Sequence, residues 1–289
     1  MDFYEIRQRS GKAKNTIEVY PDFIVSKSKD LMIRSNCFYA VWDKDKNLWS
    51  TDEIDVQRII DDDIRNYAEK LSSSMSDVKI IPKFTKSYSS NSWIQFKGYL
   101  AKMPDCYTEL DSHLTFKSDK VSKDDYISKK LNYDLCDGEY DSYEEIISTL
   151  YTPKERQKIE WSIGSIVAGD SVDIQKFLVF YGQAGSGKST IMNIVQKLFD
   201  GYYTTFDAKA LTGGNNQFAL DSFSSNPLVA IQHDGDLSRI EDNTKLNSIV
   251  SHEYMTFNRK YRESYTTQAP CFLFMGTNKP VKITDAKSG

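Results

Sequence analysis

The sequence predicts an α/β protein whose second part, residues 171–289, is a parallel sheet flanked by helices. A mixed α+β domain that ends in helices, residues 1–170, is expected to precede it. Three short apolar runs support a parallel sheet: residues 177–181, 228–231 and 271–275. Strands buried on both faces show such continuous apolar runs, and each of these runs ends in glycine or polar residues.

Length and composition limit the class of protein. With 289 residues, of which 39% are hydrophobic, the chain can supply a core for each of two domains. Residues 1–11 are polar, and no stretch approaches the roughly 18 uninterrupted apolar residues of a membrane helix. We therefore expect a soluble, cytoplasmic protein without a membrane partner, located in the host cytoplasm if the protein is viral. The four cysteines are far apart and contain no CxxC pair, which predicts neither a zinc site nor a disulfide framework.

The charge is nearly balanced along the chain. Residues 171–289 carry 12 Lys and Arg against 11 Asp and Glu, a net charge of about +1. The formal total of −4 leaves about −5 for residues 1–170. Neither half is a general polyanion-binding surface, so any contact with DNA must be local.

The first domain is expected to contain a hairpin followed by a helix. Two aromatic runs, residues 38–42 and 48–50, flank a polar segment, as in a hairpin. Ser50 and Glu53 have the spacing of a capping box for a helix that reaches about residue 71. Within this helix the triplet at residues 61–63, Asp-Asp-Asp, is interpreted as a solvated face and not as a metal site.

Two further segments complete the first domain. Residues 93–96 are interpreted as a short aromatic strand. Thr152, Pro153 and Glu155 combine an N-cap, a proline at the first helical position and a capping box, which predicts a helix that ends near Gly169. We place the domain boundary directly after this helix.

The strand at residues 177–181 leads into the segment GQAGSGKST, which fits the pattern Gx4GK[ST]. Gly182, Gly185 and Gly187 allow successive backbone N–H groups to turn inward around phosphates, and the N-terminus of the following helix adds its positive end. That helix is indicated by an apolar stripe over residues 191–199. The pattern predicts a P-loop, and a plain glycine-rich turn is the weaker alternative.

The last residues of the loop carry the charge and the hydroxyls. Lys188 is expected to bind the β- and γ-phosphates of ATP and is a candidate catalytic residue. The Ser189 hydroxyl is expected to complete the coordination of Mg²⁺. Thr190 follows in the first helical turn and is assigned to the same nucleotide site.

An acidic partner is expected at the end of a neighbouring strand. The strand at residues 228–231 is followed by Gln-His-Asp-Gly-Asp, in which Asp234 is the preferred carboxylate for holding Mg²⁺ or orienting the attacking water. Asp236 is the reserve candidate. An ordinary β-turn at Asp234 is the structural alternative, since Asp-Gly is a standard turn pair.

A third strand, residues 271–275, ends in Gly-Thr-Asn-Lys-Pro. The amide of Asn278 is placed to touch the γ-phosphate or the attacking water, and so to detect whether ATP is intact. By itself this short segment is more often a turn. Asn278 is therefore a catalytic candidate mainly because of its order in the chain after the loop and the acid.

Between the acid and the amide lies a segment typical of a hairpin. Residues 255–257 alternate apolar with polar side chains, and polar residues 264–267 follow. The connecting tip carries the candidate nucleic-acid-binding residues Arg259, Lys260, Tyr261 and Arg262. A basic and aromatic tip can pair with phosphates and stack on a base. A solvated surface hairpin is the alternative.

Taken in order, the segments GQAGSGKST, LVAIQHDGD, MTFNRKYRESY and FLFMGTNKP resemble the A, B, B-prime and C motifs of superfamily 3 helicases, and those of phage and poxvirus-type primase-helicases in particular. The resemblance is strong over about residues 175–289 and less specific over about 30–170. It implies an AAA+-like P-loop ATPase fold and a hexameric ring that hydrolyses ATP at subunit interfaces. It also implies a hairpin that projects into the ring channel, with Lys260 at its tip.

The chain departs from the family pattern in two respects. His233 stands where many relatives carry a second acid, so the usual acidic pair is absent. In this family the arginine finger lies downstream of the C motif. We therefore expect the finger beyond Gly289. Because such a finger is worth about 10³ to 10⁵ in rate, we expect the 289-residue chain alone to hydrolyse ATP slowly.

The expected function is that of an ATP-dependent DNA helicase or translocase in phage or plasmid replication, with ATP and Mg²⁺ as cofactors. Its expected partners are single-stranded DNA, further copies of the same chain and a primase or polymerase. The alternatives are a P-loop ATPase that acts as a replication initiator or loader without unwinding, and an ATP-gated assembly module. The P-loop alone also permits a small-molecule kinase, which the basic hairpin does not support.

Overall fold

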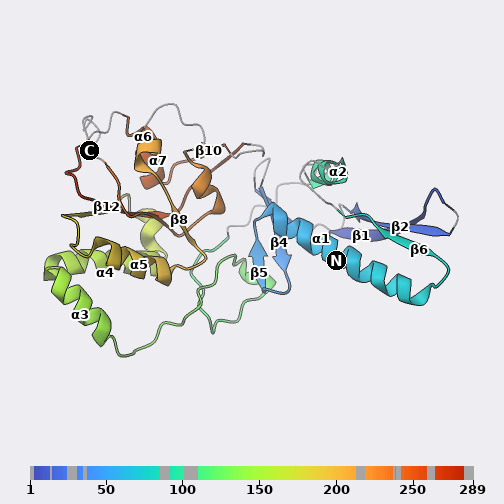
Figure 1. Cartoon of the computed structure of the whole chain (residues 1–289), viewed down its shortest axis with the longest axis horizontal. Helices are drawn as coiled ribbons and strands as arrows, with labels where there is room; N and C mark the ends of the chain where they lie inside the picture. Colours follow the sequence, from blue (N-terminus) through green and yellow to red (C-terminus); the bar gives the residue numbers. More distant parts are fainter. Residues whose placement is uncertain are drawn as a thin grey trace. The chain divides into compact units, whose positions relative to one another are not determined.

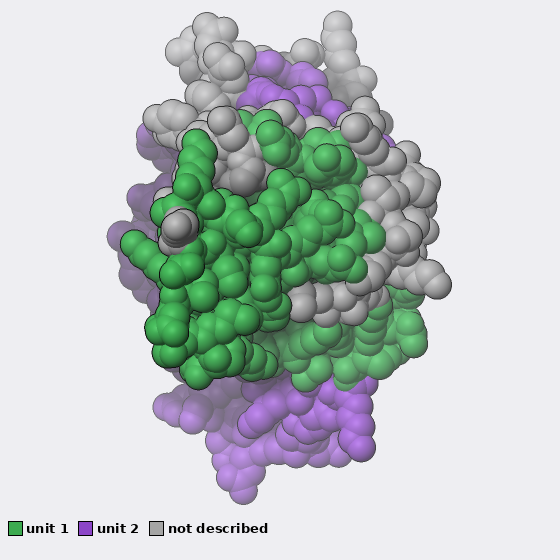
Figure 2. Space-filling model, turned by 90° about the vertical axis from the view of Figure 1, so that its right-hand side faces the viewer, with its two compact units in different colours: residues 1–111, 121–128 green, residues 112–120, 129–289 purple. Residues whose placement is uncertain are grey.

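The structure is a computed structural model, and it describes residues 3–13, 15–24, 31–34, 38–84, 91–100, 110–212, 219–236, 238, 242–258 and 264–282. The chain divides into two compact units, shown in separate colours in Figure 2. The first unit comprises residues 1–111 with 121–128, and the second comprises residues 112–120 with 129–289. The division expected near residue 170 lies inside the second unit, because the helices that precede it share a core with the parallel sheet.

The first unit is a mixed α+β structure with two small sheets. In one sheet β1 pairs antiparallel with β2, and β2 pairs parallel with β6. The other is the antiparallel meander β3-β4-β5, which confirms the predicted hairpin. The bounds are β1 Tyr4–Ser10, β2 Thr16–Phe23, β3 Leu31–Arg34, β4 Phe38–Asp43, β5 Leu48–Ser50, α1 Glu53–Ser74, β6 Lys79–Pro82 and α2 Asn91–Leu100.

Helix α1 forms where it is predicted, but its first residues differ from the prediction. Asp52 is the N-cap, and its carboxylate accepts a hydrogen bond of 2.9 Å from the Ile54 amide. The Ser50 hydroxyl donates instead to the Asp55 carboxylate, at 2.6 Å. The predicted capping box of Ser50 and Glu53 is therefore wrong, because a carboxylate that directly precedes the helix is an equally good cap with the required local geometry.

The predicted strand at residues 93–96 is also wrong, because this segment lies in helix α2. Trp93 and Phe96 are both buried, and their rings stack with centroids 5.4 Å apart. Residues three apart lie on one face of a helix, whereas they point to opposite faces of a strand. The Trp93 indole N–H also donates to the Glu53 carboxylate at 2.5 Å, which anchors α2 to the start of α1. Packing has therefore overridden the preference of aromatic residues for strands.

The acidic triplet of α1 makes contacts typical of a helix surface. Asp62 forms an ion pair of 2.5 Å with Arg65, and Asp63 accepts a hydrogen bond from the Tyr4 hydroxyl. Among the residues that the structure describes, no group of three or more His, Cys, Asp or Glu side chains is arranged to hold a metal ion. Nor does any helix within the described ranges have the length and apolar character needed to cross a membrane.

The second unit contains a four-stranded parallel sheet with the strand order β7-β12-β9-β8. This sheet confirms the predicted α/β class. The bounds are α3 Asp141–Leu150, α4 Pro153–Val167, β7 Leu178–Tyr181, α5 Lys188–Leu198, β8 Tyr203–Thr205, α6 Ala208–Thr212, β9 Val229–Gln232, α7 Thr244–Val250, β10 Met255–Phe257, β11 Tyr265–Thr267 and β12 Phe272–Thr277.

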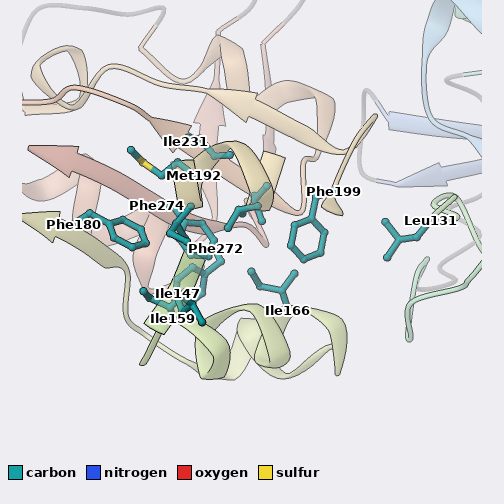
Figure 3. Close-up of a cluster of buried hydrophobic side chains, with 13 residues drawn as sticks. Leu131, Ile147, Ile159, Ile166, Phe180, Met192, Phe199, Ile231, Phe272 and Phe274 are labelled. Carbon is teal, nitrogen blue, oxygen red and sulfur yellow. The ribbon is translucent and has the colours of Figure 1, made fainter. Parts of the chain in front are cut away.

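Helices cover both faces of this sheet. Helices α4 and α5 lie on one side, and α6 and α7 lie on the other (Figure 1). Figure 3 shows Phe272 and Phe274 of β12 packed with Ile159 of α4 in the buried cluster on the first side. All six residues of β12 are buried, as its apolar run predicts for a central parallel strand.

Helix α4 begins as its sequence predicts. The Thr152 hydroxyl accepts a hydrogen bond of 3.4 Å from the Glu155 amide, and the Glu155 carboxylate accepts one of 2.9 Å from the Thr152 amide. Pro153 occupies the first helical turn, where its missing N–H has no cost. This reciprocal capping box fixes the start of α4, and Ile159 and Ile166 then point into the core.

Gly276 is the position in β12 with the least space for a side chain. A Cβ at this residue would lie 2.4 Å from the His233 carbonyl oxygen and 2.7 Å from the Met192 methyl group. We expect Gly276→Ala to lower the free energy of unfolding of the second unit by about 1–3 kcal/mol, as overpacking does. Denaturant unfolding followed by circular dichroism measures this change.

The matched control is Gly164→Ala in α4, since within the described part of the chain no atom beyond the neighbouring helix backbone lies within 4 Å of its Cβ position. Alanine is the better helix former by about 0.5–1 kcal/mol, so this variant should be slightly more stable than the wild type. Equal stability of the two variants would show that β12 and the segment after β9 are not in close contact at Gly276.

Candidate functional site

The loop between β7 and α5 has a backbone that depends on glycine. Gly185 and Gly187 have φ values of +81° and +80°, in the left-handed region that glycine adopts without a Cβ penalty. Gly187 is also the N-cap of α5, and a Cβ there would lie 2.5 Å from a methyl group of Leu150 in α3. Both the conformation and the space around the loop therefore require Gly187.

Lys188, the first residue of α5, points back into this loop. Its side chain is 9% exposed. The ammonium group donates to the carbonyl oxygens of Gly182 and Gln183 and to Asn278 Oδ1, each at 2.8 Å, and lies 3.3 Å from Ser186 Oγ. The lysine is thus held by oxygen atoms at the mouth of the loop, beside the amino end of a helix.

The next two residues have a different environment. Ser189 and Thr190 lie in the first turn of α5, and both are exposed. Ser189 is therefore an exposed residue at the amino end of α5. This position agrees with the predicted role of Ser189 as a ligand and leaves that role a prediction.

The carboxyl ends of three neighbouring strands are joined by backbone hydrogen bonds. The Gly182 amide, after β7, donates to the Thr277 carbonyl at 3.2 Å. The Gly235 amide, after β9, donates to the Gly276 carbonyl at 2.7 Å. Because β12 lies between β7 and β9, Asn278 is brought beside the glycine loop and the acidic segment is brought next to β12.

The two candidate acids after β9 differ in their contacts. Asp236 forms an ion pair with Lys279 at 2.7 Å and a longer one with Lys209 at 3.6 Å, and it accepts hydrogen bonds from the amide and hydroxyl of Ser238. Hydrogen bonds from Lys279 and then Ser238 hold the pKa of the Asp236 carboxyl below its usual value. Asp234 is exposed. Asp236 thus already has a cationic partner, and the preference for Asp234 stays a prediction.

Lys279 was not among the candidates from the sequence. The Asp236 carboxylate raises the pKa of the Lys279 ammonium, first through their hydrogen bond, and the charge of Asp234 acts in the same direction. The turn that carries Lys279 is fixed by its amide, which donates to the Thr277 hydroxyl at 3.1 Å. In the sequence, the signal for this residue is a lysine directly after Asn278. The strand order is needed to show that the Lys279 side chain reaches the segment after β9.

The hairpin is present as two short strands. β10 and β11 pair antiparallel, and Phe257 of β10 is buried. The predicted DNA-binding residues Arg259, Lys260, Tyr261 and Arg262 lie outside the described residues. Their role stays a prediction that rests on the sequence.

A family model matches residues 180–288, which is less than half of the chain. Its description is "Family of unknown function (DUF5906)". The matched region contains the glycine loop, both candidate acids, the hairpin and β12. All the predicted site residues therefore lie within the region that this family model covers.

Solved structures of one other protein are similar over most of the chain. One, an A-form apo structure of the C-terminal region of NrS-1, has a TM-score of 0.51 at 14% identity and covers 89% of this chain. The NrS-1 C-terminal region shares this fold. Two further apo structures of the same region give TM-scores of 0.48 and 0.49 at 13% identity, covering 91% and 89% of this chain. The chain spans 56–58% of the length of these structures.

Proposed function

We propose that the second unit binds ATP in the loop between β7 and α5 and hydrolyses it. The observation that carries this proposal is the position of Lys188, whose ammonium lies inside a glycine loop at the amino end of a helix. Loop N–H groups, a helix N-terminus and one lysine form a binding site suited to a chain of phosphates. The match to a family of unknown function does not indicate which substrate is bound. The fold shared with NrS-1 does not indicate it either.

Two residues are suited to hold the magnesium ion of Mg·ATP. Ser189 and Asp234 present a hydroxyl and a carboxylate that are both exposed. Mg²⁺ prefers oxygen ligands and is typically held by one or two protein groups together with phosphates and water. When bound, the ion neutralises charge on the phosphates. The donor types of these two residues fit that requirement.

The chain's own residues have separable roles in the proposed reaction. Lys188 stabilises the charge of the β- and γ-phosphates, and Asp234 orients the attacking water. Asn278 contacts the γ-phosphate or this water. Since β12 is adjacent to both β7 and β9, these three side chains lie along one edge of the sheet. Electrostatic stabilisation by such preorganised groups is commonly the largest contribution to catalysis.

We further propose that hydrolysis drives movement along single-stranded DNA, as in the helicases that the motifs resemble. The working form is then a homo-hexameric ring with ATP between subunits, acting in phage or plasmid replication together with a primase or polymerase. The antiparallel pairing of β10 with β11 supports the DNA-binding part of this proposal, since these are the strands on either side of the basic segment in the sequence.

The DNA-binding proposal predicts a change in salt dependence. Replacing Lys260 and Arg262 together with alanine should weaken single-strand binding and lower the slope of log affinity against log salt by roughly 0.7 per lost phosphate contact, about 1.4 in total. Fluorescence anisotropy of a labelled oligonucleotide at several salt concentrations measures both quantities. Basal ATP hydrolysis should be unchanged, since these residues are not placed in the nucleotide site.

The matched control replaces two exposed lysines of α4, Lys154 and Lys158, with alanine. This control removes the same number of positive charges elsewhere and should leave the salt slope unchanged. Equal effects of the two double variants would indicate that DNA responds to overall charge and not to the hairpin. DNA-stimulated hydrolysis without unwinding of a tailed duplex would favour the initiator or loader function.

A further inference from the structure

The contact between Lys188 and Asn278 determines how the amide of Asn278 is turned. Lys188 has an ammonium group, which can donate hydrogen bonds but cannot accept them. Its Nζ atom is therefore paired with the amide oxygen of Asn278, at 2.8 Å. The Nδ2 group of the same amide is necessarily directed elsewhere.

A phosphate would pair with the other polar group of this amide. Phosphate oxygens accept hydrogen bonds, so Asn278 can bind a γ-phosphate only through Nδ2. The ammonium of Lys188 must also turn toward the phosphates, although it already lies 2.8 Å from three oxygen acceptors, one of which is Asn278 Oδ1. An ammonium has three N–H groups, so Lys188 must release at least one of these acceptors before it can donate to a phosphate.

We propose that Asn278 is a two-position switch that restrains Lys188 in the absence of nucleotide and turns its amide toward the phosphate when nucleotide binds. This inference rests on the proposed ATP site and deepens it, because it gives Asn278 an inhibitory role in binding besides its role in hydrolysis. The restraint is built into the fold: Lys188 begins α5, Asn278 follows β12, and the Gly182–Thr277 backbone hydrogen bond holds the loop against the end of that strand.

The switch predicts that removing the amide strengthens nucleotide binding. Because a net hydrogen bond is worth about 0.5–1.5 kcal/mol, Asn278→Ala should tighten ADP binding by about two- to tenfold. ADP lacks the γ-phosphate, so its binding gains no favourable contact with Asn278. ADP is therefore a more informative ligand than ATP for this test. Asn278→Asp should weaken ADP binding by tenfold or more, since a carboxylate pairs more strongly with Lys188 and repels the phosphates.

Titration calorimetry with Mg·ADP on the 289-residue chain measures these changes. Asn247→Ala, on α7, is the matched control and should bind ADP as the wild type does. A residue that only contacts phosphate would give the opposite sign or no change for Asn278→Ala, and weaker or equal ADP binding by that variant would overturn the switch. If the wild type itself bound neither ADP nor ATP, the proposed ATP site would fail as well, so the two failures are distinguishable.

A second measurement does not depend on nucleotide. The restrained ammonium of Lys188 should react slowly with an amine-acetylating reagent, and Asn278→Ala should increase its labelling at least about twofold, as expected for the loss of one net hydrogen bond. Lys279 and Lys209, both exposed, serve as internal references in the same mass spectrum. Unchanged labelling of Lys188 in a variant that retains the wild-type circular dichroism spectrum would also overturn the proposal.

Discussion

Lys188→Ala should reduce the rate of ATP hydrolysis by at least about a hundredfold, the range seen when one preorganised donor is removed from a reaction site. The ammonium group of Lys188 lies inside the glycine loop, where it donates to two loop carbonyls. Because its partners are loop carbonyls and Asn278, its loss leaves the apolar core of the second unit intact. A coupled-enzyme assay for ADP release measures the rate.

The same variant needs a test of folding. The circular dichroism spectrum should match the wild type, since the apolar buried residues of α5, which are Ile191, Met192 and Val195, are unchanged. Lys197→Ala, at the other end of α5, removes the same charge far from the loop and should retain full activity. An unfolded Lys188→Ala variant, or one with normal turnover, would contradict the assignment of this lysine to phosphates.

Asp234→Asn should lower turnover by about 10² or more, and it should do so more than Asp236→Asn. A carboxylate that orients water or holds the metal acts mainly in the transition state, so kcat should fall more than the affinity for ATP changes. Asp236 is already paired with Lys279 at 2.7 Å and with Ser238, so its loss should mainly release Lys279. Steady-state kinetics of both variants measures kcat and KM separately.

The kinetics of the two acid variants can also contradict the preference for Asp234. If Asp236→Asn lowers kcat as much as Asp234→Asn or more, the catalytic role moves to Asp236 and its ion pair becomes part of the active arrangement. Lys209→Ala is the control, because Lys209 reaches Asp236 only at 3.6 Å. It should leave kcat unchanged.

The second unit was the more predictable part of the fold. Its strands are continuous apolar runs ended by glycine or polar residues, and β7, β9 and β12 lie within one or two residues of their predicted bounds. The helix at α4 was predictable because its capping box is a local signal. Patterns that depend on neighbouring residues are therefore recovered well from this sequence.

The two errors in the first unit have different causes. Aromatic residues at 93–96 favour a strand locally, yet the segment is helical because Trp93 and Phe96 share a buried face against α1. The start of α1 differs because Asp52 competes with Ser50 as the cap. The choice of cap is thus local, whereas the position of α2 depends on a contact between residues 40 positions apart, which no local periodicity contains.

In the candidate site, too, local features were predictable and contacts between distant residues were not. The glycine loop, Lys188 and Ser189 follow from a motif of nine consecutive residues. The pairing of Lys188 with Asn278 joins residues 90 positions apart, and that of Asp236 with Lys279 joins residues 43 apart. Both pairs depend on β12 lying between β7 and β9, and this order is a property of the folded sheet.

Direct binding of ATP to the wild-type 289-residue chain tests the central claim most closely. Isothermal titration with a non-hydrolysable ATP analogue should give saturable binding that requires Mg²⁺, is competed by ADP and is lost in Lys188→Ala. The same protein samples should show identical circular dichroism spectra, so that a negative result refers to folded protein. Absence of saturable binding to the folded wild type, or equal binding by wild type and Lys188→Ala, would contradict a phosphate site in this loop.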